Sequence, residues 1–216
     1  HDIKTPITSI QATVEGILDG VIKEDEQIHY LTTISRQTER LNKLVEELDV
    51  LTLNAQPRIE SDGEAEIVFL DQLLIEVMSE FQLLIEQEER DIYIQVFPES
   101  AKIKSHYDKL SRILVNLLNN AFKYSDPGTK IEVVAQLTEQ ILTISVKDEG
   151  QGIAPEDLDK IFKRLYRVET SRNMKTGGHG LGLAIARELA HQLGGEITVE
   201  SQCGLGSTFT FALNLA

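Results

Sequence analysis

Residues 177–190 read GGHGLGLAIARELA, in which four glycines lead directly into a stretch with the apolar spacing of a helix. A glycine-rich segment at the start of a helix is a common anion site. The first N–H groups of a helix have no partner within it, and the helix dipole is positive at that end. Flexible glycine loops are also common, so this stretch alone leaves a phosphate site and a plain loop both open.

A second stretch, NLLNNAFKYS at residues 116–125, lies on a predicted helix over 107–124. Asn116 and Asn120 are four residues apart and Lys123 is three further on, so the three share one face. Amide oxygens suit Mg²⁺, and an ammonium group suits phosphate. The alternative is a polar, solvated face on a helix whose other face packs in the core.

Two further stretches contain glycines next to predicted strands. In DEGQGI at 148–153, Asp148 ends a strand and could accept a hydrogen bond from an amine. Gly150 and Gly152 permit a close backbone approach or a positive φ. GLGSTFTF at 204–211 opens the last predicted strand and could equally be a hairpin turn.

The predicted elements around these stretches indicate an α/β domain. EIVFL and DIYIQV read as strands on either side of a helix, and residues 130–137 and 141–148 read as a hairpin with alternating apolar residues. A helix over 180–193 and the strands EITVES and STFTFAL follow. We expect one mixed, mostly antiparallel sheet with helices on one face.

Taken together, in this order and spacing, the four stretches resemble the boxes of the Bergerat-fold ATPases. This superfamily includes gyrase B, MutL, the heat-shock chaperone ATPases and the sensor histidine kinases. The N-box would be NLLNNAFKYS, the G1 box DEGQGI, the G2 box GGHGLGL and the G3 box GLGSTF. Between them, IFKRLYRVETSRN is similar to the F-box of the histidine kinases in particular. The resemblance implies that the domain binds ATP with Mg²⁺.

The resemblance also implies roles for individual residues. Asp148 would accept a hydrogen bond from the adenine amino group, and Asn120 would be the main Mg²⁺ ligand. Lys123 and the backbone of Gly178–Gly182 would hold phosphates. Guanine presents an acceptor where adenine presents the amine, so a carboxylate facing it would be unpaired, at a cost of roughly 1–3 kcal/mol. We therefore predict a preference for ATP over GTP.

Residues 150–178 would form a lid over the nucleotide, with Phe162 anchoring it, Arg167 near phosphate and Tyr124 packed near the nucleotide. The other candidate contacts are Gly150, Gly152, Ile153, His179, Gly180, Leu181, Gly182 and Thr208. Asn116 stands where the ATPase relatives carry a glutamate that activates water. An amide cannot be a general base, which favours keeping the γ-phosphoryl group for another acceptor.

The first part of the chain has a different pattern. Ile3, Ile7, Ile10, Val14 and Ile17 step by four and three along a predicted helix over 2–22, and a second helix over 25–53 continues this heptad spacing. Two helices with one narrow stripe each cannot close a core. We therefore predict a homodimer in which two hairpins form a four-helix bundle. The alternative is one hairpin packed on the rest of the chain.

HDIKTPITSI at residues 1–10 resembles the H-box of the HisKA-type dimerisation and phosphotransfer domain, with aspartate in place of the commoner glutamate. His1 would be the phosphoryl acceptor, since a largely neutral imidazole is nucleophilic at pH 7. Asp2 would orient the ring and accept its proton. Thr5, one turn along, would place a water for dephosphorylating the partner protein. Pro6 would let the helix bend.

The predicted architecture is therefore a helical hairpin that dimerises into a four-helix bundle (1–57), followed by an α/β-sandwich Bergerat ATP-binding domain (58–216). The predicted function is ATP-dependent autophosphorylation of His1 and transfer to an aspartate in the receiver domain of a response regulator, with phosphatase activity toward the regulator as a further expectation. Two alternatives stay open: an ATP-gated interaction module that transfers nothing, and a Bergerat serine kinase of the anti-sigma type. The first 55 residues argue against the second.

The composition and net charge limit the kinds of partner that this chain is expected to bind. The net charge of −14 argues against binding of nucleic acid. The sequence contains no run of about 18 apolar residues, so we expect this part of the protein to make no contact with a membrane. The single cysteine, Cys203, rules out an internal disulfide and is expected to be a small buried residue. His29, His106 and His191 are expected to have no chemical role. The resemblance implies that this chain is the cytoplasmic portion of a larger bacterial sensor anchored in the inner or plasma membrane.

Overall fold

The computed structural model describes residues 4–23, 26–38, 64–166 and 180–215. The chain divides into two compact units, His1–Arg58 and Ile59–Ala216. The predicted domain boundary at 57/58 lies outside the described residues. The two units are described separately below.

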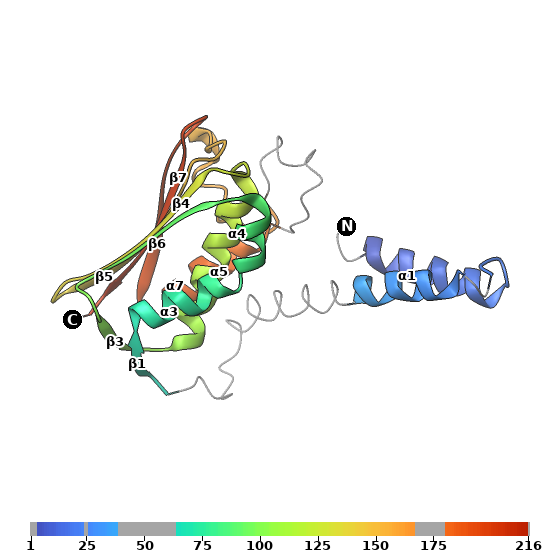
Figure 1. Cartoon of the computed structure of the whole chain (residues 1–216), viewed down its shortest axis with the longest axis horizontal. Helices are drawn as coiled ribbons and strands as arrows, with labels where there is room; N and C mark the ends of the chain where they lie inside the picture. The colour runs from blue at the N-terminus through green and yellow to red at the C-terminus, as the bar shows by residue number, and fades with distance from the viewer. Residues whose placement is uncertain (1–3, 24–25, 39–63, 167–179, 216) are drawn as a thin grey trace. The chain divides into compact units, whose positions relative to one another are not determined.

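The described part of the first unit is a helical hairpin (Figure 1). Helix α1 spans Lys4–Leu18, and residues 27–38 form the second helix. Gly20 has φ +69°, and the N–H of Ile22 donates to the carbonyl oxygen of Gly16 over 2.9 Å, which closes the turn. The remainder of the predicted second helix lies outside the described residues.

The second unit contains a five-stranded sheet in the order β2-β4-β5-β7-β6 and a two-stranded sheet of β1 and β3. β2 and β4 are parallel, and the other pairs are antiparallel. This agrees with the predicted mixed, mostly antiparallel sheet. The strands are β1 (Glu66–Phe69), β2 (Asp91–Phe97), β3 (Lys102–Ser105), β4 (Lys130–Leu137), β5 (Ile141–Asp148), β6 (Gly195–Gln202) and β7 (Gly206–Asn214).

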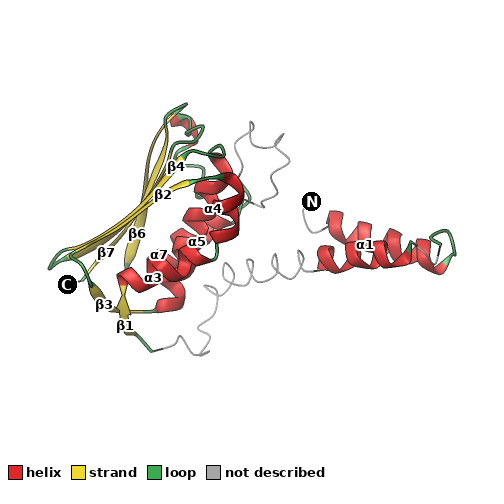
Figure 2. Ribbon diagram, in the orientation of Figure 1, coloured by secondary structure: helices red, strands yellow, loops and turns green. Residues whose placement is uncertain are grey.

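Helices cover one face of the five-stranded sheet, as Figure 2 shows. They are α3 (Leu70–Ser79), α4 (Gln82–Glu88), α5 (Tyr107–Tyr124) and α7 (Gly182–Gln192), with a 3₁₀ turn, η2, at Pro155–Asp157. The central helix α5 has a continuous buried stripe, which consists of Leu110, Ile113, Leu114, Leu117, Leu118, Ala121 and Phe122. These residues recur at intervals of three and four, which is the period that places them on one side of a helix.

The core lies between these helices and the inward faces of β4, β5 and β7. Strand residues alternate between faces, so every second residue of these strands is buried. The inward residues are Ile131, Val133, Ala135, Leu142, Ile144, Val146, Phe209, Phe211 and Leu213. This apolar surface fixes the strand register, and the register in turn decides which residues meet at the end of the sheet.

Three local features differ from the sequence-based expectation. The helix expected between the first two strands is two helices, because the chain turns at Phe81, whose ring stacks on that of Phe122 at 4.9 Å. Strand β3 was not predicted; its four residues pair with β1. Cys203 is exposed in the turn between β6 and β7, so the expectation of a buried cysteine is wrong.

Candidate functional site

A row of three polar residues crosses the end of the sheet. Asp148 at the end of β5 pairs with Ser207 on β7, and Ser207 pairs with Ser201 on β6. The preceding rung on the same face is apolar, with Val146 opposite Phe209. The last rung of an apolar sheet face is therefore polar, and Asp148 and Ser207 in it are only 3% and 7% exposed.

The carboxylate of Asp148 is held by backbone donors. The N–H of Gly150 donates to Asp148 Oδ1 over 2.9 Å, and the N–H of Ser207 also donates to this carboxylate. Burial raises the pKa of Asp148 above its ordinary value of 3.8, while the two N–H donors and the charge of Arg90 oppose that rise. A buried acceptor of this kind is suited to a neutral donor such as an aromatic amine.

The loop after Asp148 is bound on two sides. The N–H of Gln151 donates to the carbonyl oxygen of Tyr124 at the end of α5 over 3.1 Å, and the N–H of Gly204 donates to Gln151 over 2.8 Å. The N–H of Ile153 donates to Ser201 Oγ over 2.8 Å. The loop is therefore fixed to both α5 and the β6–β7 hairpin.

The glycines of this loop are required by contact. A Cβ on Gly150 would overlap the carbonyl oxygen of Tyr124 and lie 2.7 Å from Asp148 Oδ1. Gly152 has φ +68°, and a Cβ there would overlap the backbone of Gln202. The predicted close approach at these two positions is what the structure shows.

The polar face of α5 lies beside the start of α7. Asn116 Nδ2 donates to the carbonyl oxygen of Arg112 over 2.8 Å, and a Cβ on Gly182 would lie 2.9 Å from Asn116 Oδ1. The amide oxygen of Asn116 therefore points at the first residue of α7. Asn120 and Lys123 are half-buried on the same helix, and Lys123 Nζ lies 5.0 Å from the centre of the Tyr124 ring.

Among the residues that the structure describes, no side chain caps the N-terminus of α7. Leu181, which precedes the helix, is buried, and Gly180 has φ +70°. The N–H of Leu165 donates to the carbonyl oxygen of Gly180 over 3.0 Å, which fixes the chain just before the helix. The first N–H groups of a helix have no partner within it, so the phosphate site that the glycine pattern predicts at the start of this 11-residue helix stays a prediction.

The segment before residue 167 is anchored in the core. The Phe162 ring lies edge-on to Phe209 at 6.4 Å, and the guanidinium of Arg187 lies 5.2 Å from its centre. Tyr166 donates its hydroxyl to Asp157 Oδ1 over 2.6 Å. Phe162 therefore joins the core.

Several predicted site residues fall outside the described part of the chain: His1, Asp2, Arg167, Gly178 and His179. Thr5 belongs to α1, and its side chain is outside the description. The described residues contain no group of three or more His, Cys, Asp or Glu placed to hold a metal ion.

Thr208 is one of the predicted nucleotide contacts. It pairs with Lys147 and so lies on the opposite sheet face from Asp148, whereas its neighbour Ser207 lies beside Asp148. Ser201 and Ser207 were both missed by the sequence reasoning. The alternation of strand residues could have suggested them. Asp148 lies on the inward face of β5, and only one residue of each neighbouring strand lies in register with it.

Arg90 was also missed. Its side chain is fully buried, and it donates to the carbonyl oxygens of Phe122, Ser125 and Asp126 at the end of α5. Glu88 pairs with it at 2.7 Å. A cation at this position satisfies carbonyls that have no partner within the helix and opposes the negative end of the helix dipole.

The fold and this site define a class of ATP-binding protein in which a mixed sheet covered on one face by helices carries a buried carboxylate at its end. The family model described as histidine kinase-, DNA gyrase B- and HSP90-like ATPase matches residues 105–216, and that of the His Kinase A (phospho-acceptor) domain matches residues 1–56. The chain belongs to the family of sensor histidine kinases of two-component systems.

Relatives and solved structures agree with this assignment. The histidine protein kinase SaeS of Staphylococcus epidermidis is 39% identical over 217 residues, covering 99% of this chain and 60% of that protein. SaeS of Staphylococcus aureus is 38% identical over 218 residues, covering 99% and 61%. This chain thus spans about 60% of the length of these relatives.

Among solved structures, the Acinetobacter baumannii histidine kinase AdeS superposes with a TM-score of 0.78 at 28% identity, covering 100% of this chain and 98% of that chain. The histidine kinase ThkA, in complex with the response regulator protein TrrA, gives a TM-score of 0.75 at 22% identity, covering 100% and 59%. The ThkA likeness concerns the fold alone.

Proposed function

We propose that this chain is an ATP-dependent protein-histidine kinase that phosphorylates its own His1 and passes the phosphoryl group to an aspartate of a response regulator. The main support for the proposal is that one chain contains both a predicted phosphoryl acceptor and a predicted nucleotide site. A phospho-acceptor domain match begins at His1, and a later domain match contains the buried Asp148 carboxylate and the N-terminus of α7.

The proposed nucleotide contacts follow from the site. Asp148 accepts from the adenine amine, Tyr124 packs near the nucleotide, and Lys123 and the start of α7 hold phosphate oxygens. Gly150, Gly152 and Ile153 form the loop beside the base. Asn120 is the proposed ligand of Mg²⁺, which would neutralise phosphate charge when bound. Arg167, Gly178 and His179 are proposed phosphate contacts from the resemblance alone.

In the proposed transfer, the lone pair of His1 Nε2 forms a bond to the γ-phosphorus while the bond from that phosphorus to the bridging oxygen breaks, and ADP leaves. Asp2 accepts the imidazole proton and holds the ring. Asn116 cannot act as a base toward water, so hydrolysis does not compete. Such transfers depend mainly on positioning and charge neutralisation. Thr5 would place a water molecule that removes the phosphoryl group from the regulator in the opposing phosphatase activity.

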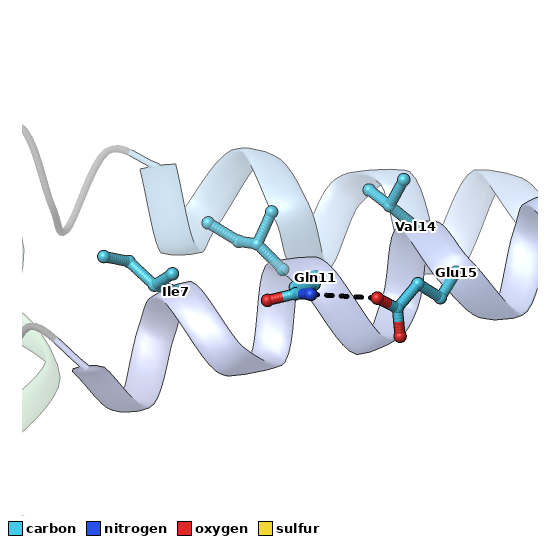
Figure 3. Close-up of a pocket in the computed structure, with 5 residues that line it drawn as sticks. Ile7, Gln11, Val14 and Glu15 are labelled. Atoms are coloured by element: carbon cyan, nitrogen blue, oxygen red, sulfur yellow. Dashed lines mark hydrogen bonds between the residues drawn. The ribbon is translucent and has the colours of Figure 1, made fainter.

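We also propose that the first unit forms a homodimer through α1. Ile7 and Val14 are 48% and 39% exposed, although they belong to the predicted apolar stripe. With Ile10, Gln11 and Glu15 they line a shallow groove along the helix (Figure 3). Exposed apolar residues at heptad spacing are the pattern of helices that pack against a second copy in a four-helix bundle.

The proposed partner of the dimer is the receiver domain of a response regulator, and the solved complex of ThkA with TrrA is a structural neighbour that supports this pairing by fold. Within the described residues, no helix is both long and apolar enough to cross a membrane. We propose that the chain is the cytoplasmic portion of a longer, membrane-anchored sensor, since it spans only about 60% of SaeS.

The proposal is tested by incubating the full-length protein with γ-labelled ATP and Mg²⁺, alongside His1→Gln and the matched control His29→Gln. Label that is stable to alkali, labile to acid, absent from His1→Gln and kept by His29→Gln is the expected result. Acid-stable label on serine would instead indicate a serine kinase. ATP binding without label in any variant would favour an ATP-gated module.

A further inference from the structure

The hydroxyl of Ser201 makes three contacts at the end of the sheet. It accepts from the N–H of Ile153 over 2.8 Å, donates to the carbonyl oxygen of Gly206 over 2.8 Å, and lies 2.9 Å from Ser207 Oγ. Each contact reaches a different part of the candidate nucleotide site: the loop after Asp148, the turn into β7, and the residue in register with Asp148.

The number of protons decides the direction of the last contact. A serine hydroxyl has one proton to donate, and a carbonyl oxygen can only accept. The proton of Ser201 is therefore used by Gly206. For the contact between the two hydroxyls to be a hydrogen bond, Ser207 must donate its own proton to Ser201. Ser207 Oγ then has only lone pairs left for any other neighbour.

The position of Ser207 makes the direction of its hydrogen bond to Ser201 important for ligand binding. Its backbone is in register with Asp148, its side chain lies on the same buried face, and it is only 7% exposed. A ligand group that approaches Asp148 from the open end of the sheet meets a carboxylate and, beside it, a hydroxyl oxygen that is unable to donate. Both favour a donor on the ligand and disfavour an acceptor.

We propose that Ser201 is a specificity-determining positioning residue, which holds the Ser207 hydroxyl as an acceptor beside Asp148 and so selects purines with an amino group at position 6 over those with a carbonyl. The inference rests on the proposed ATP-binding function and deepens it. Ser201 does not touch the base; it acts on the preference through the Ser207 hydroxyl.

The test compares the β,γ-imido analogues of ATP and of inosine triphosphate, which carry an amine and a carbonyl at position 6. Their dissociation constants are measured by calorimetry with Mg²⁺ on the whole chain. Ser201→Ala frees the Ser207 proton to donate to a carbonyl, so we expect the preference for the ATP analogue to fall at least about fivefold. Affinity for the ATP analogue itself falls less, because Asp148 remains.

Four further variants make the result specific. Ser201→Thr keeps a hydroxyl and is expected to keep the preference. Ser207→Ala is expected to lower the preference for the ATP analogue. The double variant Ser201→Ala/Ser207→Ala should lower this preference no further, because both substitutions act through the Ser207 hydroxyl. The matched control is Ser145→Ala, which removes a hydroxyl from the same sheet; that hydroxyl donates to Val134 and lies on the opposite face from Asp148. It leaves the preference unchanged.

An unchanged preference in folded Ser201→Ala, or a fully additive double variant, would overturn the inference while leaving ATP binding in place. If the wild-type chain binds neither analogue, the proposed function fails instead. Should Ser201→Ala not fold, Ser207→Ala alone decides: an unchanged preference in that variant also overturns the inference.

Discussion

The N–H of Gln151 donates to the carbonyl oxygen of Tyr124 over 3.1 Å, and this bond ties the loop after β5 to the C-terminal end of α5. The N-box and the G1 box are about 25 residues apart in sequence, yet they meet through a backbone contact that the sequence does not reveal. The space for that contact exists because position 150 has no side chain.

Gly150→Ala is therefore expected to weaken ATP binding at least about tenfold, because the new Cβ would overlap Tyr124 and displace the loop that carries Asp148. The control is Gly128→Ala, at φ +78° with no atom near the new Cβ. It should cost about 1–2 kcal/mol of stability through its left-handed backbone but keep ATP affinity. Calorimetric titration with ATP measures both. Equal losses in the two variants would contradict the argument.

The raised pKa of Asp148 makes a prediction about pH. Between the ordinary value and the raised value, the folded chain binds more protons than the unfolded chain, so this group lowers stability as the pH rises through that interval. Asp148→Asn does not titrate. The unfolding free energy of the wild type, relative to Asp148→Asn, should therefore fall as the pH rises from about 4 toward neutrality, without ligand.

Urea unfolding at several pH values measures this difference. Tyrosine fluorescence is a suitable signal, because four of the five tyrosines lie beyond residue 58. A difference that does not change with pH, or that changes in the wild type's favour as the pH rises, would show that burial does not dominate at Asp148.

Arg90→Met is expected to lower the unfolding free energy by about 3 kcal/mol or more, because several buried carbonyl oxygens at the end of α5 lose their donor at once. Arg90→Lys keeps the positive charge but not the planar guanidinium, so its unfolding free energy should lie between those of the wild type and Arg90→Met. Lys130→Met is the control: its ion pair with Glu132 is partly exposed, so its loss should change the unfolding free energy little. Urea unfolding separates the three.

Val14→Glu is expected to convert a dimer of this chain into a monomer, because it places a charge in the middle of the apolar stripe of α1. Ala12→Glu is the matched control, since Ala12 is exposed and lies on the opposite side of the same helix. Light scattering at micromolar concentration gives the mass of each. A wild type that is already monomeric, or two variants with the same mass, would contradict the dimer.

The organisation of this chain could be predicted from local patterns in its sequence. Heptad spacing at Ile7, Ile10 and Val14 predicted a helical hairpin, strand alternation predicted the sheet, and the spacing of the glycine and asparagine boxes gave the family. These signals are local, because helix and strand periods and the need for glycine at close approaches act over a few residues. Asp148, Gly150 and Gly182 could be singled out on that basis.

Contacts between residues far apart in the sequence could be seen only in the folded chain. The register of β7 against β5 places Ser207, and not Thr208, beside Asp148, and that of β6 against β7 brings Ser201 to Ser207. Arg90 reaches the end of α5 from more than 30 positions away. Register is set by the summed burial of apolar residues along whole strands, and a shift of one residue reverses every side chain, so no short motif contains this information.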